Sequence, residues 1–197
     1  GPTIRRFEGS EAAEVENLAA PVTAFAVDAA GQRAWATLDG GLSLPVTPRG
    51  LPEGAARRCI TGIAFDGAGG VFLTIGSTTN AADAWQKDLL ERQATGSLWH
   101  IPPTGAARQI AGGLAWPEAP LALPDGSVIL SECSASQVLR IAATGRSETL
   151  IANLPGYPAG LCRMGDGYAL CLKAPRNQLI EFILRERAFA AEMIARV

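Results

Sequence analysis

The chain has 197 residues and a formal net charge of −2, and no run of basic residues exceeds two. Nucleic-acid binding is therefore not expected, because phosphate recognition requires a clustered basic face. No apolar stretch approaches the roughly 18 residues of a membrane span, and no signal peptide is visible. We therefore expect a soluble protein, and the sequence does not indicate its cellular compartment. The 48% of hydrophobic residues, with 22 Gly and 13 Pro, favour an all-β fold with many tight turns.

Short apolar runs recur along the chain and are bounded by turn residues. Residues 3–19 contain two such runs around a turn at Gly9-Ser10. Residues 21–38, 59–75, 116–132 and 157–172 each contain a pair of runs around one glycine, namely Gly31, Gly70, Gly126 and Gly167. These glycines are 39, 56 and 41 residues apart. Removing about 15 residues from the long interval restores a period near 40, the length of one four-stranded propeller blade.

Residues 78–93 account for the long interval. Their sequence has the composition of an inserted helix or lid and not of a strand, and reads TTNAADAWQKDLLERQ. Asp83, Trp85, Asp88 and Glu91 would then lie over the centre of the fold. A plain solvated helix is the alternative interpretation.

Residues 112–160 show the repeated unit most clearly. Two apolar runs flank Pro124-Asp125-Gly126, which is typical of a strand, a turn and a strand. Two further short runs follow at residues 138–141 and 149–151, which completes four strands in about 40 residues. We therefore predict a single all-β domain over residues 1–197, a β-propeller with about four to five blades.

A propeller protects its strand edges by closing its ring. We accordingly expect this ring to be closed by another copy of the chain or by further blades. The end at Val197 carries no terminating signal, which favours blades that follow it. Gly1-Pro2 has the form of a remnant left by a protease, so we expect the native start to be missing.

The sequence resembles the strictosidine synthase-like group, which belongs with gluconolactonases and paraoxonases among six-bladed propellers. The resemblance spans roughly residues 59–197, and more weakly the N-terminal third. It is carried by LAWPEAPLALPDGSVILSE, QVLRI, LPGYP and APRNQLIEFILRERAFAAEMIARV. It implies a propeller with a ligand site in its central channel, and in the hydrolases of the group a calcium-type cation held there by Asn and Asp oxygens.

The chain departs from the group at the three positions that would hold this cation. Thr61-Gly62 replaces an Asn-Asp pair, Glu118 replaces an Asn, and Ala159-Gly160 replaces an Asp-Asn pair. One carboxylate cannot supply a cage of four or five oxygens. We therefore predict no metal and no cofactor, with calcium as the alternative that the resemblance implies. Strictosidine synthase itself works without a metal, through a carboxylate in its last blade, which would lie past Val197.

The candidate site residues follow from the same correspondence. Glu118, at a channel-facing position, would be a carboxylate on the pocket floor that binds a cation or amine or acts as a general base. Thr61 occupies the first lost cation position, and Ser77 ends a motif that is Thr-Asp-Ala-Ser in the group. Tyr157 would line the channel mouth, or pack beneath the proline-rich corner. For Glu118 the alternative is a loop residue in water or in a salt bridge.

The remaining candidate residues favour structural roles. His100, the only histidine, lies in a strand at an outer blade position, so a nucleophilic triad or a zinc site is not indicated. A two-residue turn at Asp166-Gly167 would place Cys162 opposite Cys171, about 4.5 Å apart between Cα atoms. A disulfide is then possible, with two reduced, buried thiols as the alternative. Cys59 and Cys133 are predicted core residues.

Two classes of function remain open, and the partner is a small-molecule ligand in both. The first is a binding propeller with a degenerate metal site. The second is a metal-free enzyme, either a hydrolase of lactones or esters or a strictosidine synthase-like lyase, which would use Glu118 or a residue in a missing blade. A scaffold that binds protein through a flat face is a weaker third alternative.

Overall fold

The computed structural model describes residues 2–195, which form five antiparallel sheets. The first is the hairpin of β1 (Thr3–Glu8) and β2 (Glu11–Asn17), and the second comprises β3 (Val22–Val27), β4 (Arg33–Thr37) and β5 (Leu42–Ser43). The third contains β6 (Ile60–Phe65), β7 (Val71–Ile75), β8 (Gly96–Ile101) and β9 (Arg108–Leu114). The fourth contains β10 (Pro117–Ala122), β11 (Val128–Glu132), β12 (Gln137–Ile141) and β13 (Ser147–Ile151), and the fifth is the hairpin of β14 (Gly156–Met164) and β15 (Gly167–Pro175).

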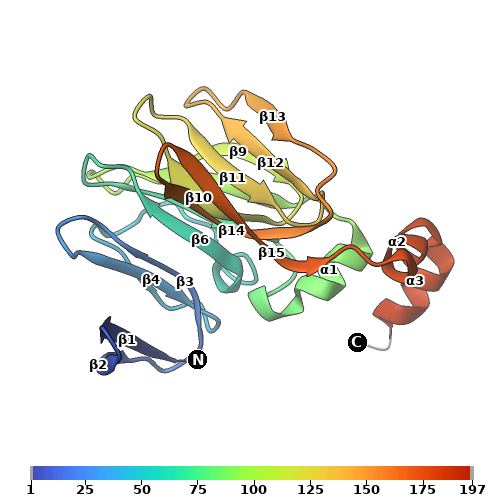
Figure 1. The fold of residues 1–197 in the computed structure, drawn as a ribbon, viewed down its shortest axis with the longest axis horizontal. Helices are drawn as coiled ribbons and strands as arrows, with labels where there is room; N and C mark the ends of the chain where they lie inside the picture. The colour runs from blue at the N-terminus through green and yellow to red at the C-terminus, as the bar shows by residue number, and fades with distance from the viewer. Residues whose placement is uncertain (1, 196–197) are drawn as a thin grey trace.

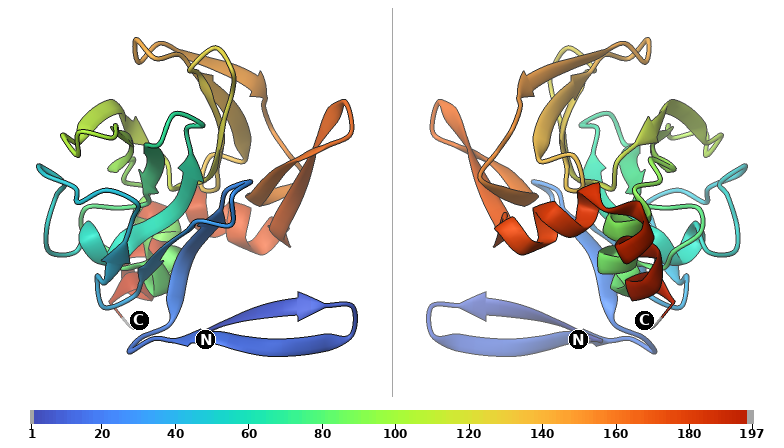
Figure 2. Two further views of the ribbon diagram at one scale, coloured as in Figure 1. Left: turned by 90° about the vertical axis from the view of Figure 1, so that its left-hand side faces the viewer. Right: turned by 90° about the vertical axis from the view of Figure 1, so that its right-hand side faces the viewer.

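The sheets follow one another around a partial ring (Figures 1 and 2). From the second sheet onwards, the first strand of each sheet packs on the first strand of the next, so β3 contacts β6, β6 contacts β10, and β10 contacts β14. Two sheets are complete four-stranded blades and two are partial ones, while the β1–β2 hairpin lies beside the ring. The prediction of an all-β propeller with four to five blades is confirmed.

Besides the sheets, the described part of the chain contains three helices and two 3-10 turns. The 3-10 turns span Arg57–Cys59 and Ala82–Ala84, and the helices are α1 (Trp85–Glu91), α2 (Gln178–Arg185) and α3 (Arg187–Ile194). The insertion at residues 78–93 therefore contains α1, and α3 packs against α1 although nearly 100 residues separate them in the sequence. Within residues 2–195, no helix is long and apolar enough to cross a membrane.

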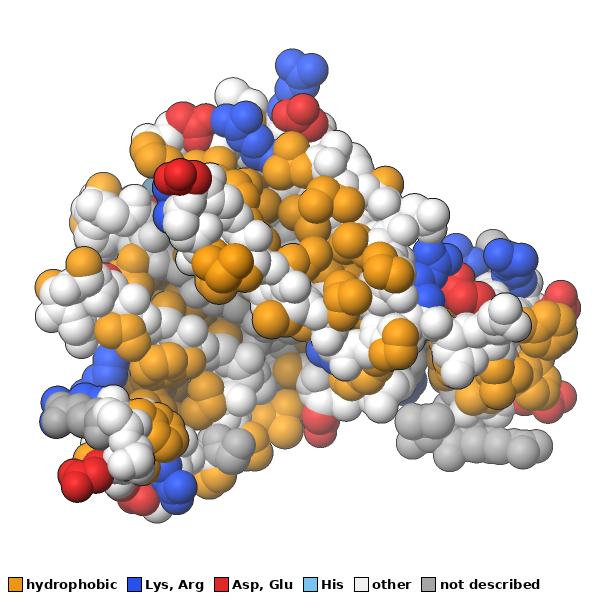
Figure 3. Space-filling model, in the orientation of Figure 1, with side chains coloured by type: hydrophobic (Ala, Val, Ile, Leu, Met, Phe, Trp, Pro, Cys, Tyr) orange, Lys and Arg blue, Asp and Glu red, His pale blue; other side chains and the backbone are white. Residues whose placement is uncertain are grey.

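The core lies between neighbouring blades. The strands β7 and β11 are buried along their whole length, because each faces a neighbouring sheet on both sides. Where the ring ends, the last hairpin has no such neighbour, and Met164, Tyr168 and Leu172 are exposed. Figure 3 shows hydrophobic side chains gathered on this face, in the area where Figure 1 places β14 and β15.

The predicted pairing of Cys162 with Cys171 is wrong. The turn of the last hairpin lies one residue earlier, because Gly165 takes a positive φ of 56° and Met164 pairs with Gly167. Cys162 therefore pairs with Ala169. Both thiols are free and exposed, whereas Cys59 and Cys133 are buried in the core as predicted.

Candidate functional site

Glu118 lies at the start of β10, and its side chain already has two partners. The carboxylate is largely buried, with 8% of the residue exposed. Its Oε1 accepts hydrogen bonds from Trp116 Nε1 at 2.8 Å and from Lys173 Nζ at 2.5 Å. The same ammonium lies 5.0 Å from the ring centroid of Trp85, which adds a cation–π contact from α1. A carboxylate from one blade and a lysine from the next thus form an ion pair beneath the inserted helix.

The backbone around Glu118 is shaped to hold this side chain. Trp116 and Ala119, on either side, have positive φ angles of 55° and 49°. The β10–β11 register is irregular between Glu118 and Leu121, and such irregularities re-aim side chains next to sites. Ser131 Oγ lies 3.1 Å from Glu118 O and 3.2 Å from the carbonyl oxygen of the next blade's Ala159. Positive φ angles in non-glycine residues persist only where the surrounding structure enforces them.

Thr61 joins two blades next to Glu118. Its Oγ1 donates to Pro117 O at 2.6 Å and lies 3.0 Å from Thr74 Oγ1. Gly62 follows at the closest approach of β6 and β10, where a Cβ atom would lie 2.3 Å from Pro120 Cδ. At Thr61, therefore, the hydroxyl is hydrogen bonded by protein, and Gly62 stands where the structure leaves no room for a side chain.

Thr61 and Glu118 both line a cavity of about 300 Å³. Pro21, Val22 and Leu38 contribute apolar surface to the lining, and Asp83 and Lys173 contribute charges. Thr23 lines the same cavity, and its buried Oγ1 has no hydrogen-bond partner within the described part of the chain. The lining charges, two carboxylates and one ammonium, leave one negative charge in excess.

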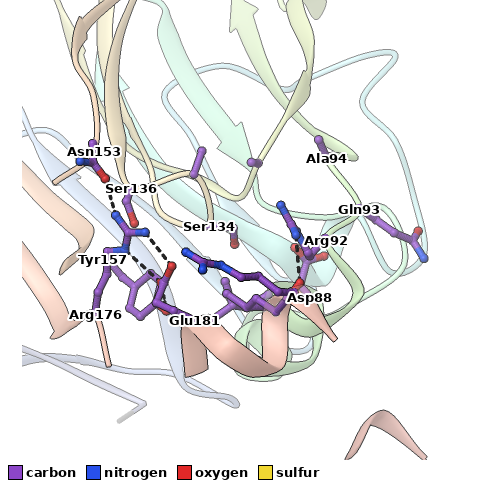
Figure 4. A pocket seen from close by; sticks show the side chains of 15 residues that line it. Asp88, Arg92, Gln93, Ala94, Ser134, Ser136, Asn153, Tyr157, Arg176 and Glu181 are labelled. Carbon is purple, nitrogen blue, oxygen red and sulfur yellow. Dashed lines mark hydrogen bonds and ion pairs between the residues drawn. The ribbon is translucent and has the colours of Figure 1, made fainter. Parts of the chain in front are cut away.

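The structure places the other two predicted site residues outside this cavity. Ser77 is fully buried, and its Oγ accepts hydrogen bonds from the N–H groups of Thr79 and Asn80, which shapes the loop before α1. Tyr157 lines a second cavity near α2, where its hydroxyl donates to Glu181 at 3.4 Å (Figure 4). Burial, with the nearby Glu181, raises the pKa of Tyr157, so the phenol stays protonated.

The sequence interpretation missed Lys173, Trp116 and Thr23. The signal for Lys173 was one basic residue near the end of an otherwise apolar strand, and its contact with Glu118 depends on how two blades meet. Trp116 precedes Pro117 and was assigned only as the start of a blade. The unpartnered hydroxyl of Thr23 has no counterpart in sequence at all, because it depends on what surrounds the side chain.

The residues present do not fit a calcium-type cation. Among the residues that the structure describes, no three His, Cys, Asp or Glu side chains come together as metal ligands. Three residues stand where the sequence comparison expected cation ligands. The hydroxyl of Thr61 is hydrogen bonded, Glu118 is paired with a lysine, and Ala159 has no polar side chain. A hard divalent cation requires several free oxygen ligands, mostly carboxylates and carbonyls. The ammonium of Lys173 already contacts the carboxylate of Glu118.

His100 has a structural environment on β8. Its Nε2 lies 2.9 Å from Asp66 Oδ2, and its ring stacks on Phe72 with centroids 4.6 Å apart. Burial alone would raise the pKa of Asp66, but hydrogen bonds from His100 and from the N–H groups of Ala68 and Gly70 lower it below the usual 3.8. The histidine thus fixes the β6–β7 turn and lies outside both cavities.

Neither a protein-family model nor a curated protein sequence matches this chain. Solved structures do match it. A protein described as a gluconolactonase has a TM-score of 0.54 at 11% identity over 77% of this chain and 57% of its own. A streptogramin B lyase has a TM-score of 0.52 at 9% identity over 79% of this chain and 52% of its own.

The calcium-binding protein regucalcin from Agrobacterium tumefaciens gives a similar result. Its TM-score is 0.53 at 15% identity, over 77% of this chain and 52% of its own. The chain thus spans about half the length of the structures it matches. Identities this low show the fold alone, a β-propeller shared by lactonases, lyases and a calcium-binding protein.

Proposed function

We propose that this chain is a strictosidine synthase-like propeller that binds a small molecule in the cavity beside Glu118 and needs no metal. The observation that carries the proposal is the contact of 2.5 Å between Lys173 Nζ and Glu118 Oε1 at the cavity wall. The ammonium of Lys173 supplies the positive charge that a bound cation would otherwise bring to Glu118. A cavity of about 300 Å³ is at the lower end of the size of small-molecule sites.

The lining indicates the chemistry of the ligand. Thr23 offers a hydroxyl that no described protein group satisfies, and a buried polar group of this kind costs free energy until a partner binds it. The excess negative charge disfavours an anion. Trp116 and Leu38 add apolar surface. The proposed ligand is therefore a small, neutral or amine-bearing molecule with at least one hydroxyl or carbonyl group.

A metal-free enzyme is the second candidate, and the same pair supports it. Glu118 and Lys173 line one cavity, so a carboxylate and an ammonium would both lie beside an ester or lactone bound there. In such a reaction Glu118 would act as a general base towards water and Lys173 would stabilise the developing oxyanion. A strictosidine synthase-like lyase would use either Glu118 or a carboxylate of a blade outside this sequence.

Glucono-1,5-lactone and phenyl acetate distinguish the two candidates. Binding of the lactone is measured by calorimetry, and turnover of both compounds is measured with added calcium and with EDTA. A binding propeller gives saturable lactone binding, weakened in Thr23→Val, without turnover. Turnover that is unaffected by EDTA and is lost in Glu118→Gln establishes the metal-free enzyme. Calcium-dependent turnover, or neither binding nor turnover, contradicts the proposed site.

A further inference from the structure

A second cavity, of about 450 Å³, lies between the helices and the loops of the two complete blades. Its lining includes Arg92 at the end of α1, Ser134 and Ser136 in the β11–β12 turn, and Arg176 and Arg185 around α2. Figure 4 shows labelled side chains from these separate segments around one space. It is distinct from the cavity beside Glu118, because the two share no lining residue.

Ser136 presents an unused hydroxyl to this cavity. The residue is only 5% exposed, and no described residue forms a hydrogen bond with its side chain. Its backbone is fixed at a φ of 51° by hydrogen bonds to Cys133 O and from Leu154 N. A hydroxyl at a cavity wall that has no protein partner can bind water or a ligand. The turn thus holds one donor in the cavity wall.

Both carboxylates of the lining already have protein partners, an arginine for Glu181 and an amide for Asp88. Arg176 contacts Glu181 through Nε at 3.0 Å and Nη2 at 2.6 Å, and its Nη1 donates to Asn153 at 2.6 Å. Asp88 is 1% exposed and accepts a hydrogen bond from Asn80 at 3.2 Å. Burial raises the pKa of Asp88 above its usual value.

Two guanidinium groups remain for a ligand. Arg92 uses Nη1 to reach Leu184 O at 3.0 Å, so its other nitrogens stay available. Arg185 lines the cavity, and among the described side chains it forms no hydrogen bond or close ion pair, although its charge contributes to lowering the pKa of Glu181. Three arginines against two carboxylates leave the lining of the cavity with one positive charge in excess. This is the opposite sign to the cavity beside Glu118.

We propose that this second cavity binds the oxyanion group, a phosphate or a carboxylate, of a small organic molecule. The guanidinium groups of Arg92 and Arg185 and the hydroxyl of Ser136 hold its oxygens. Arginine suits this role because its planar fork matches the geometry of both oxyanions. The volume exceeds that of a bare inorganic ion, so the remainder of the molecule has room beside Tyr157.

Calorimetry with inorganic phosphate and with acetate tests the proposal, at a constant ionic strength set by chloride. We expect saturable binding of at least one of them to the unaltered chain. Arg185→Gln and Ser136→Gly should each weaken that binding by about fivefold or more. Glycine at position 136 accepts the positive φ, so this variant removes the hydroxyl without backbone strain.

Arg146→Gln is the matched control, because it removes the same charge from an exposed position on the β12–β13 turn. Its affinity should stay within about twofold of the unaltered chain, and so should that of Glu118→Gln, which alters only the other cavity. The proposal is overturned if neither anion binds saturably, or if Arg146→Gln weakens binding as much as Arg185→Gln.

Discussion

At the scale of single residues, the ion pair between Glu118 and Lys173 determines what the first cavity can do. Removing a carboxylate from water is costly unless a charged partner and hydrogen bonds replace the water. Here both are supplied by protein, from Lys173 and Trp116. The side chain expected to be a free ligand or a free base is therefore held in an ion pair, the alternative that the sequence interpretation left open.

Breaking this pair should destabilise the fold from either side. Lys173→Met leaves the carboxylate without its ammonium, and we expect a loss of about 2 kcal/mol in the free energy of unfolding. Glu118→Gln should cost a similar amount, since Lys173 then loses its charged partner. Urea unfolding of both single variants and the double variant measures the coupling. Strictly additive effects would show that the two side chains do not interact.

At the scale of elements, the β6–β7 turn is held by one carboxylate. Asp66 Oδ1 accepts from Ala68 N at 2.7 Å and Gly70 N at 2.8 Å, and Oδ2 contacts His100 at 2.9 Å. The turn thus depends on β8, its neighbour in the sheet. These contacts favour the ionised carboxylate, which is why its pKa in the folded chain is below 3.8.

The stability that Asp66 contributes should depend on pH. Because folding lowers its pKa, the contribution is present in full above the unfolded value near 3.8 and is lost as the pH falls through the folded value. Asp66→Asn should therefore cost about 1–2 kcal/mol at pH 6. The difference from the unaltered chain should shrink below pH 4. Urea unfolding of both proteins across this pH range measures the difference in their free energies of unfolding. A difference that does not change with pH would contradict the prediction.

The contact between β6 and β10 depends on a glycine. Gly62→Ala should destabilise the fold by about 2–4 kcal/mol, because the new Cβ would lie 2.3 Å from Pro120 Cδ and 2.9 Å from Ala119 N. Gly167→Ala is the control, since a Cβ there meets nothing closer than 3.9 Å. Thermal unfolding compares the two. Equal effects would mean that β6 and β10 can separate at little cost.

At the scale of the whole molecule, stability is expected to vary around the ring. The two complete blades have neighbours on both sides, and they contain most of the fully buried side chains. The β1–β2 hairpin pairs mainly with itself, and within the described residues no other strand or helix packs extensively on it. Its large side chains Phe7 and Val15 are exposed.

Hydrogen exchange should therefore separate the hairpin from the blades. Elements with few buried apolar contacts open locally at low cost in free energy. We expect amides of β1 and β2 to exchange at least about a hundredfold faster than those of β7 and β11 at neutral pH. Mass spectrometry of peptides from residues 3–17 and 128–141 measures the ratio. Equal protection would show that the hairpin is docked on the ring in solution.

The sequence by itself determined the fold class, because the repeat of turn residues and short apolar runs is local information. Strand pairs around Gly31 and Gly126 follow from neighbouring residues alone, and so does the helical insertion at residues 78–93. The sequence also shows that Thr61 and Ala159 carry no carboxylate, so that neither side chain offers an acidic oxygen to a cation.

Only the tertiary structure decided what surrounds Glu118. The partner Lys173 is 55 residues away on another blade, and no pattern within either strand predicts that the two side chains meet. The second cavity likewise forms from α1, α2 and the blade loops. Tyr157 lines this cavity and not the one beside Glu118. The physical reason is that strand periodicity depends on neighbouring residues, whereas ion pairs and cavities depend on the packing of segments far apart in the chain.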